Sequence, residues 1–204
     1  NDPTPCRIAI SVEYDGSGYR GWQAQKHDTR VVQTEVEKAL SKVADEPINV
    51  VCSGRTDSCV HASSQICHFD TVAHRDPYNW VMGVTTQLPN DISLSWAQQV
   101  DPEFHARFSA RSRQYVYHIR QSPYRSALLR NSMTFTHKRL EPELMGEAGS
   151  SLLGTHDFNA YRSAQCQAKT SVRTLSHLSV HSHEDLIAVH VEANGFLQNM
   201  VRNI

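Results

Sequence analysis

Residues 48–69 run INVVCSGRTDSCVHASSQICHF and predict two strands joined by a polar turn. The first strand covers residues 48–52, directly after Pro47, and the second lies around residues 64–69. Asp57 stands in the turn, on the kind of loop where a rigid scaffold often presents catalytic groups. An aspartate that only caps a turn would have the same surroundings, so both interpretations stand.

The residues on either side of this stretch predict a first α+β lobe. Residues 7–14 alternate polar and apolar side chains, which indicates a half-buried strand. A helix follows in which apolar residues recur at helical spacing, namely Val32, Val36, Ala39, Leu40 and Val43. Residues 77–87 predict a second helix and residues 92–98 a further strand.

The second half of the chain has the same kind of pattern. We predict the following elements: strands at 113–120, 172–180 and 186–193, a helix at 144–153 that Gly154 ends, and a last helix at 194–204. Two successive halves of this kind favour two similar α+β lobes, residues 1–110 and residues 111–204, each an antiparallel sheet with helices.

The composition is that of an ordinary soluble globular protein, with 204 residues, 39% hydrophobic and 20% charged. No apolar run approaches the roughly 18 residues that span a bilayer, and the N-terminus lacks the layout of a signal peptide. We therefore expect a cytoplasmic protein without a membrane partner. The five cysteines are scattered, which favours free thiols over a disulfide framework.

A zinc site is one alternative for Cys59, His61, Cys67 and His68, which lie close together in the sequence. Their spacing does not match the usual ligand pairs. Cys67 and His68 are neighbours in a predicted strand, so their side chains should point to opposite faces. We expect a buried Cys67, a solvated His68 and no metal.

Basic residues are concentrated in one part of the chain. The formal net charge is -1, yet residues 104–140 hold eight basic side chains and no carboxylate. Most are arginines, whose planar guanidinium groups match phosphate oxygens, and aromatic residues that could stack on bases are interleaved. This block is typical of a nucleic-acid-binding surface, although a solvated basic face would have the same composition.

The turn motif resembles that of a known family. Residues 54–61, GRTDSCVH, are similar to GRTDAGVH in the tRNA pseudouridine synthases of the TruA type. Other segments match that family in the same order: residues 13–17, 21–23, 32–33, 104–110, 113–117, 154–158, 165–167 and 200–204. Several motifs in one order are far more specific than any one of them.

The resemblance implies a fold and an activity. Each half would hold an RNA-recognition-like sheet with helices, and the two sheets would join around a central catalytic cleft. The activity would be isomerisation of uridine to pseudouridine at positions 38 to 40 of the tRNA anticodon stem-loop, after base flipping, with no cofactor and no metal. Members of the family work as homodimers on tRNA.

The resemblance also assigns roles to residues. Asp57 matches the essential aspartate, acting as nucleophile or base, Arg202 the arginine that pairs with it, and Tyr115 the tyrosine that packs against the target base. Arg55 matches the residue that assists flipping. The implied tRNA contacts are Phe104, His105, Ala106, Arg107, Phe108, Gln165, Cys166, Gln167, Ala168 and Lys169, with Arg75 as a weaker candidate. By residue type alone, Arg202 could be a surface arginine and Tyr115 a core aromatic.

The chain departs from the family motif at two positions. Ser58 replaces Ala, and Cys59 replaces Gly. If that Gly serves a positive φ angle, a Cβ there costs about 1 to 2 kcal/mol and displaces Asp57, so reduced activity is expected. The family continues for several tens of residues beyond the segment 200–204, so we expect the second lobe to be truncated.

Two other functions compete with the enzyme. A catalytically impaired tRNA-binding or RNA-chaperone module would keep the same fold and basic block. A small-molecule hydrolase would use Asp57 with His61, but these two residues lack the third, orienting group that such chemistry needs.

Overall fold

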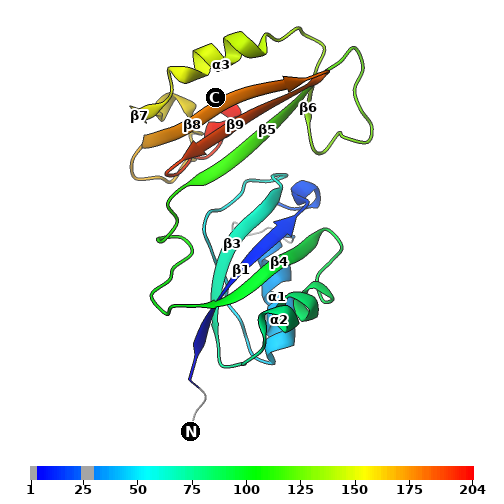
Figure 1. Cartoon of the computed structure of the whole chain (residues 1–204), viewed down its shortest axis with the longest axis vertical. Coiled ribbons are helices and arrows are strands. Elements are labelled where there is room, and N and C mark those ends of the chain that lie inside the picture. The colour runs from blue at the N-terminus through cyan, green and yellow to red at the C-terminus, as the bar shows by residue number, and fades with distance from the viewer. Residues whose placement is uncertain (1–3, 24–29) are drawn as a thin grey trace. The chain divides into compact units, whose positions relative to one another are not determined.

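The computed structural model describes residues 4–23 and 30–204. The chain divides into two compact units, Asn1–Ala110 and Arg111–Ile204 (Figure 1). Each unit is a sheet with helices, so the predicted mixed α+β class is confirmed. No helix in the described part of the chain is long and apolar enough to cross a membrane.

The first unit contains a four-stranded antiparallel sheet. Its strands are β1 (Cys6–Tyr14), β2 (Val51–Cys52), β3 (Ala62–Thr71) and β4 (Ile92–Val100), in the order β2-β3-β1-β4. The long strand β1 is central and pairs with β3 on one side and β4 on the other. Its pairing with β3 shifts register between Val12 and Tyr14, and such bulges re-aim side chains at the end of a strand.

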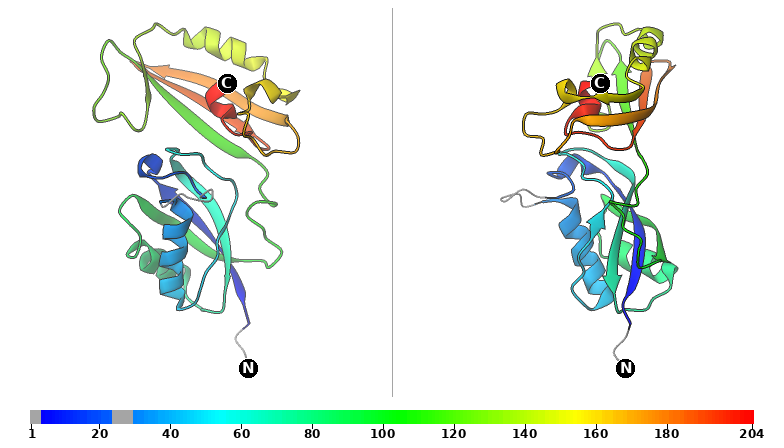
Figure 2. Two further views of the ribbon diagram at one scale, coloured as in Figure 1. Left: turned by 180° about the vertical axis from the view of Figure 1, so that it is seen from behind. Right: turned by 90° about the vertical axis from the view of Figure 1, so that its left-hand side faces the viewer.

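Two helices bury one face of this sheet. Helix α1 (Val32–Ala44) places Val32, Val36 and Leu40 on its apolar face, and helix α2 (Pro77–Thr85) adds Trp80 and Val84 (Figures 1 and 2). These side chains form one buried cluster with Ile8, Ile10, Val12, Cys67 and Phe69 of the sheet. Helix α1 ends where Asp45 adopts a left-handed conformation, at φ 60°.

The opposite face of the sheet is crossed by residues 101–109. Arg7 donates hydrogen bonds to the backbone carbonyls of Pro102 and Phe104, at 2.6 and 2.8 Å. His68 accepts one from the backbone N–H of Ala106 at 3.1 Å. This cover explains why His68 is only 4% exposed, so the prediction of a solvated His68 was wrong.

The second unit is built on a five-stranded sheet. Its strands are β5 (Arg113–Gln121), β6 (Thr134–Thr136), β7 (Gly154–Asp157), β8 (Val172–His183) and β9 (Leu186–Ala193), in the order β6-β5-β9-β8-β7. All pairs are antiparallel except β5 and β6, which run parallel. The predicted antiparallel strands are therefore confirmed, and the parallel pair involves only β6, an edge strand that the sequence did not predict.

Two helices and one buried cluster complete the second unit. Helix α3 (Pro142–Ser150) packs on β8, where a Cβ added to Gly149 would collide with Leu178. The short helix α4 (Met200–Asn203) follows a loop that buries Leu197. The cluster consists of Phe158, Leu175, Val191, Ala193, Leu197 and Met200.

Two predicted elements are shorter than the sequence pattern indicates. Of residues 48–52, only Val51 and Cys52 form a strand, because side chains of α1 take the preceding N–H groups: Ile48 donates to Ser41 Oγ and Val50 to Glu37 Oε1. The helix predicted at 194–204 begins only at Met200, because Asn199 adopts a left-handed conformation, at φ 63°.

Candidate functional site

Asp57 lies in a turn between β2 and β3. The turn begins where the Ser53 N–H donates to the Ile66 carbonyl at 2.8 Å, and it closes where the Val60 N–H donates to the Asp57 carbonyl at 3.2 Å. The Asp57 side chain is partly exposed. Within the described part of the first unit, no side chain or N–H forms a hydrogen bond or ion pair with its carboxylate. The turn therefore presents a carboxylate that its own unit leaves available.

The last residue of β1 and the segment that follows it hold this turn in place. The Tyr14 and Thr56 hydroxyls are hydrogen-bonded at 2.8 Å. The backbone N–H of Trp22 donates to the Thr56 carbonyl at 3.1 Å, and the backbone N–H of Cys59 donates to the Tyr19 carbonyl at 3.3 Å. The Asp57 turn is thus fixed by both its side chains and its backbone.

Glycine is required where this segment meets the turn. Gly21 has φ 93°, and a Cβ on it would lie 2.5 Å from the Thr56 carbonyl oxygen. A Cβ on Gly16 would collide with the carbonyl of Val60. The two contacts lie on either side of Asp57, so the segment can approach the turn only because both positions lack side chains.

Cys59 occupies a strained position beside the carboxylate. Its φ angle is 62°, in the left-handed region that a Gly at this motif position would adopt freely. The side chain is exposed, and its Sγ contacts the Ser17 carbonyl at 3.8 Å. The condition for strain at Cys59 is therefore met, while its effect on activity stays a prediction.

Arg55 and His61 lie at the two ends of the same turn. Arg55 is exposed, as a residue that meets RNA must be. His61 Nδ1 lies 3.0 Å from Asp15 Oδ1 and 3.2 Å from the Gly16 N–H, so its ring is engaged by the segment after β1. This contact does not make His61 a base directed at Asp57, and it gives no support to the hydrolase alternative.

Residues 104–108 divide into an anchored part and an exposed part. Ala106 is buried, and its N–H donates to His68; the Phe104 ring packs edge-on against the same imidazole at 6.0 Å. Burial lowers the pKa of His68, which favours the neutral ring that accepts this hydrogen bond.

Arg107 and Phe108 form the exposed part of that segment. The Phe108 ring lies 4.2 Å from the His105 ring, and the Arg107 guanidinium lies 5.7 Å from the centre of the Phe108 ring. Phe108 is 77% exposed. An exposed aromatic beside a guanidinium group can stack on a base and contact a phosphate at once.

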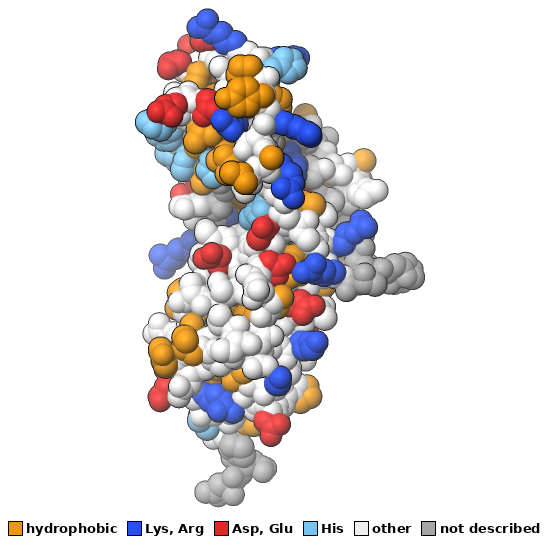
Figure 3. Space-filling view, turned by 90° about the vertical axis from the view of Figure 1, so that its right-hand side faces the viewer, with side chains coloured by type: hydrophobic (Ala, Val, Ile, Leu, Met, Phe, Trp, Pro, Cys, Tyr) orange, Lys and Arg blue, Asp and Glu red, His pale blue; other side chains and the backbone are white. Residues whose placement is uncertain are grey.

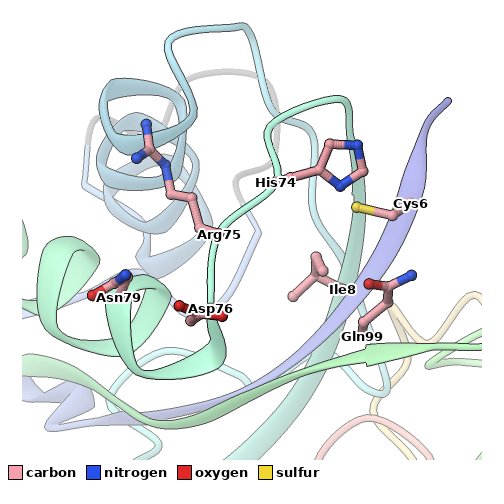
Figure 4. Close-up of a pocket in the computed structure, with 7 residues that line it drawn as sticks. All are labelled: Cys6, Ile8, His74, Arg75, Asp76, Asn79 and Gln99. Atoms are coloured by element: carbon pink, nitrogen blue, oxygen red, sulfur yellow. The ribbon is translucent and has the colours of Figure 1, made fainter. Parts of the chain in front are cut away.

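Arg75 lies away from the Asp57 turn, at the other end of β1. It lines a pocket of about 340 Å³ together with Cys6, Ile8, His74, Asp76, Asn79 and Gln99 (Figure 4). Its guanidinium group points away from Cys6 and Gln99 in that view. Arg75 is exposed and available to a phosphate, but the structure does not bring it to the turn.

Tyr115 and Arg202 belong to the second unit. Tyr115 lies in β5, where its partly buried ring packs edge-on against Phe196 at 5.1 Å. Arg202 lies on α4 and is exposed, while Met200 of the same helix is buried in the cluster of that unit. The ring of Tyr115 also packs against the buried cluster of this unit, so Tyr115 contributes in part to the core, as one of the two interpretations of its residue type expects.

Residues 165–169 alternate between anchoring and exposed side chains. Cys166 and Ala168 pack against the buried cluster of the second unit. Gln165, Gln167 and Lys169 are exposed. The segment therefore exposes two amides and one ammonium group, a set that suits sugar and phosphate contacts.

Most of the basic block is on the surface. The exposed members are Arg107, Arg111, Arg125, Arg130, Lys138 and Arg139. Arg120 is half-buried and pairs with Asp185 at 2.7 Å. Figure 3 shows one face of the molecule, on which Lys and Arg side chains lie beside exposed hydrophobic ones. Among the residues that the structure describes, no group of three or more His, Cys, Asp or Glu could hold a metal ion.

Sequence reasoning missed two residues that support these features. Tyr14 was predicted as a residue of the strand at 7–14 and lies in the matched segment 13–17, but no role was assigned to it, although its hydroxyl reaches the Asp57 turn. His68 counted as solvated, although it anchors residues 104–106. The signal for Tyr14 was its place at the end of a strand, directly before the Asp15-Gly16 turn. The position of His68 depends on a loop that follows it by more than thirty residues.

Comparisons with known proteins agree with the resemblance of the motifs. Residues 10–109 and 148–204 match the model of a family described as tRNA pseudouridine synthase. The chain is 50% identical over 198 residues to tRNA pseudouridine synthase A of Pseudomonas aeruginosa, which covers 97% of this chain and 70% of the relative.

Two further relatives have the same name. The Pectobacterium atrosepticum protein is 49% identical over 204 residues, covering 100% of this chain and 72% of the relative. The Pseudoalteromonas atlantica protein is 48% identical over 198 residues, covering 97% and 75%. The chain therefore belongs to the tRNA pseudouridine synthase family, whose enzymes isomerise uridine to pseudouridine in tRNA.

Proposed function

We propose that this protein converts uridine to pseudouridine in the anticodon stem-loop of tRNA, at positions 38 to 40, with Asp57 as the catalytic carboxylate. One observation carries the proposal. The Asp57 turn is fixed by Tyr14, Trp22 and Tyr19, while no group described in its own unit occupies the carboxylate. Fixing the backbone and leaving the reactive group available is the preorganisation that catalysis requires.

The reaction breaks the bond between C1′ of the ribose and N1 of uracil, and then joins C1′ to C5. The proton on C5 is lost, and N1 gains one, so no external reactant is consumed. Asp57 serves either as the nucleophile or as the base. No cofactor or metal takes part in this scheme.

Two residues of the second unit receive roles by their match to the family motifs. Arg202 supplies the cation that keeps the Asp57 carboxylate ionised, since a guanidinium group can hold a carboxylate through two parallel hydrogen bonds. Tyr115 packs against the target uracil with its ring. The exposure of Arg202 and the partial exposure of Tyr115 are compatible with these roles.

The RNA contacts fall on exposed side chains. Arg55 assists in turning the target base out of the stack, which the enzyme needs because a stacked uridine is out of reach. Arg107 and Lys169 contact phosphates, Phe108 stacks on a base, and Arg75 is a more distant phosphate contact. Charged and aromatic groups of this kind position an RNA without reading its sequence. The protein acts in the cytoplasm as a homodimer.

A second candidate function is tRNA binding without catalysis. It is favoured by one observation, the positive φ angle of Cys59, two residues from Asp57. If a Cβ at this position moves the carboxylate from its productive geometry, the fold and the RNA contacts persist while turnover is lost.

Tritium release distinguishes the two functions. The protein is incubated with tRNA that carries tritium at C5 of uridine, beside Asp57→Asn and the control Asp45→Asn, an exposed aspartate at the end of α1. We expect release by the protein and the control but not by Asp57→Asn, and none from tRNA with cytidine at positions 38 to 40. Turnover by Asp57→Asn would contradict the assigned role. Salt-sensitive tRNA binding with no release by the unaltered protein would favour the binding function.

A further inference from the structure

Tyr14 is buried at the end of the central strand of the first unit. It is 3% exposed, and β1 pairs at this residue with Ala62 of β3 and with Ile92 of β4. Its ring packs against Trp22, with 6.0 Å between ring centres. Pairing on both sides and burial make this one of the most firmly placed side chains of the unit.

The Tyr14 hydroxyl reaches out of this rigid frame to the catalytic turn. It is hydrogen-bonded to Thr56 Oγ1 at 2.8 Å. Thr56 is also held by its carbonyl, which accepts from the Trp22 N–H at 3.1 Å. Because Thr56 directly precedes Asp57, these two contacts fix the peptide that leads into the carboxylate. The Val60 N–H fixes the following side through the Asp57 carbonyl.

The alternation of β1 explains how Tyr14 comes to lie on the core face beside the turn. Tyr14 continues the series of Ile10 and Val12, which belong to the same buried cluster, while the register with β3 shifts opposite it because β3 contains one extra residue there. Folding alone would be served by any large apolar ring at this position, packed on Trp22. A phenol hydroxyl adds nothing to that packing and costs free energy on burial unless it is hydrogen-bonded.

We propose that Tyr14 is a positioning residue for the isomerisation, and that its hydroxyl, acting through Thr56, sets the position of the Asp57 carboxylate. The inference rests on the proposed catalytic role of Asp57. Tyr14 itself touches neither the substrate nor the reacting atoms. Its effect belongs to the chemical step, because a small displacement of a reacting group costs up to about 100-fold in rate.

The test compares variants that remove single oxygens. Tyr14→Phe and Thr56→Val each delete one hydroxyl, and the double variant deletes both. We expect each single variant to lower kcat for tritium release by about 10-fold to 100-fold, with KM for tRNA changed by less than about twofold. The double variant should be no slower than the slower single variant, because both act through one hydrogen bond.

Two controls separate positioning from folding. Thr56→Ser keeps the hydroxyl and should retain at least about half of kcat, since the hydrogen bond to Tyr14 can still form. Tyr78→Phe makes the same chemical change on an exposed tyrosine of α2 and should leave kcat unaltered. Thermal unfolding of all variants shows how much folded protein each assay contains.

The outcomes are distinct for the inference and for the proposed function. Wild-type kcat in both Tyr14→Phe and Thr56→Val, or a loss that follows the loss of folded protein, would overturn the positioning role. A double variant in which the two decreases in kcat multiply would also overturn it, because the two hydroxyls would then act independently. Asp57→Asn, assayed in parallel, tests the proposed function: if it turns over, both fail, whereas an inactive Asp57→Asn beside a fully active Tyr14→Phe rejects the positioning role alone.

Discussion

The imidazole of His68 accepts a hydrogen bond from the backbone N–H of Ala106 at 3.1 Å, and this bond ties residues 101–109 to the face of the sheet opposite α1 and α2. It requires an unprotonated Nδ1. Burial lowers the pKa of His68 below its ordinary value of 6.5, and the nearby positive charges of Arg7 and His105 lower it further, against an opposing effect of Asp70.

The first prediction concerns acid. Because the folded protein holds His68 at a lowered pKa, the unfolded chain binds the proton more tightly, and the stabilisation present above pH 6.5 is lost as pH falls toward the folded pKa. We expect Tm to fall between pH 7 and pH 5, and residues 104–108 to lose hydrogen-exchange protection first.

A variant isolates the contribution of His68 from the other histidines. His68→Gln keeps an acceptor for the Ala106 N–H but does not titrate, so it should flatten the decrease in Tm. His74→Gln, at an exposed position, should leave the pH dependence unchanged. Equal pH dependence in the protein and in His68→Gln would show that this imidazole does not govern the loop.

The second prediction concerns the strain at Cys59. Its φ of 62° costs a residue with a Cβ about 1 to 2 kcal/mol of folding free energy, which Gly does not incur. Part of this benefit is offset because Gly makes the unfolded chain more flexible. We expect Cys59→Gly to raise the free energy of unfolding by about 0.5 to 1 kcal/mol. Urea denaturation measures it, with Cys59→Ala as the control that removes sulfur but keeps the Cβ.

Activity should change in the same direction if strain displaces the carboxylate. Cys59→Gly should then turn over tRNA faster than the unaltered protein, while Cys59→Ala should not. A Cys59→Gly variant with lower stability than Cys59→Ala would contradict the strain argument.

The third prediction concerns tRNA binding by the exposed end of residues 104–108. Arg107→Ala removes one phosphate contact, so the slope of log Kd against log salt should decrease by about 1. Phe108→Ala should weaken binding by about 1 to 3 kcal/mol at every salt concentration, because stacking does not release counterions. Filter binding at salt concentrations from about 50 to 300 mM measures both the slope and the affinity.

The matched control is Lys38→Ala, an exposed cation on α1. It should leave both slope and affinity unchanged. An unchanged slope in Arg107→Ala would place the phosphate contacts elsewhere in the basic block.

The fourth prediction concerns Gly21. A methyl group there would stand 2.5 Å from the Thr56 carbonyl, at a φ of 93° that disfavours any side chain. We expect Gly21→Ala to lose more than about 2 kcal/mol of stability and to lower kcat, since the displaced group is the peptide before Asp57.

Gly146→Ala, in helix α3, provides the comparison, because its new methyl group would lie 3.9 Å from Val180, an ordinary van der Waals distance. Removing a helical glycine should leave stability unchanged or raise it by up to about 1 kcal/mol. Similar effects in the two variants would mean that contact with the turn is not what requires Gly21.

Regular periodicity was sufficient to predict the longest elements. Strand β9 spans the predicted residues, and helix α1 buries Val32, Val36, Ala39 and Leu40 of the predicted face. Short edge strands escaped prediction because they lack a pattern: β6 has three residues, β7 has four, and all but Thr136 are exposed. Their positions depend on partners distant in the sequence.

The candidate site likewise combines a residue that a local motif predicts with residues whose positions depend on contacts distant in the sequence. Asp57 was predicted from a local motif, and its place in a turn after a strand is local as well. Tyr14 and Thr56 are 42 residues apart, so no spacing rule connects them. The burial of His68 likewise depends on residues 101–109, whose polar composition predicts only a loop.

Cys59 gives the protein a built-in attachment point for a reporter group. Of the five thiols, it alone is exposed; Cys52 and Cys166 are partly covered, and Cys6 and Cys67 are buried. A maleimide dye should therefore couple there first, two residues from Asp57, without any engineered cysteine. Fluorescence from that dye would report the binding and release of RNA beside Asp57 in real time. The same residue that strains the turn would thus allow RNA binding at the turn to be measured directly.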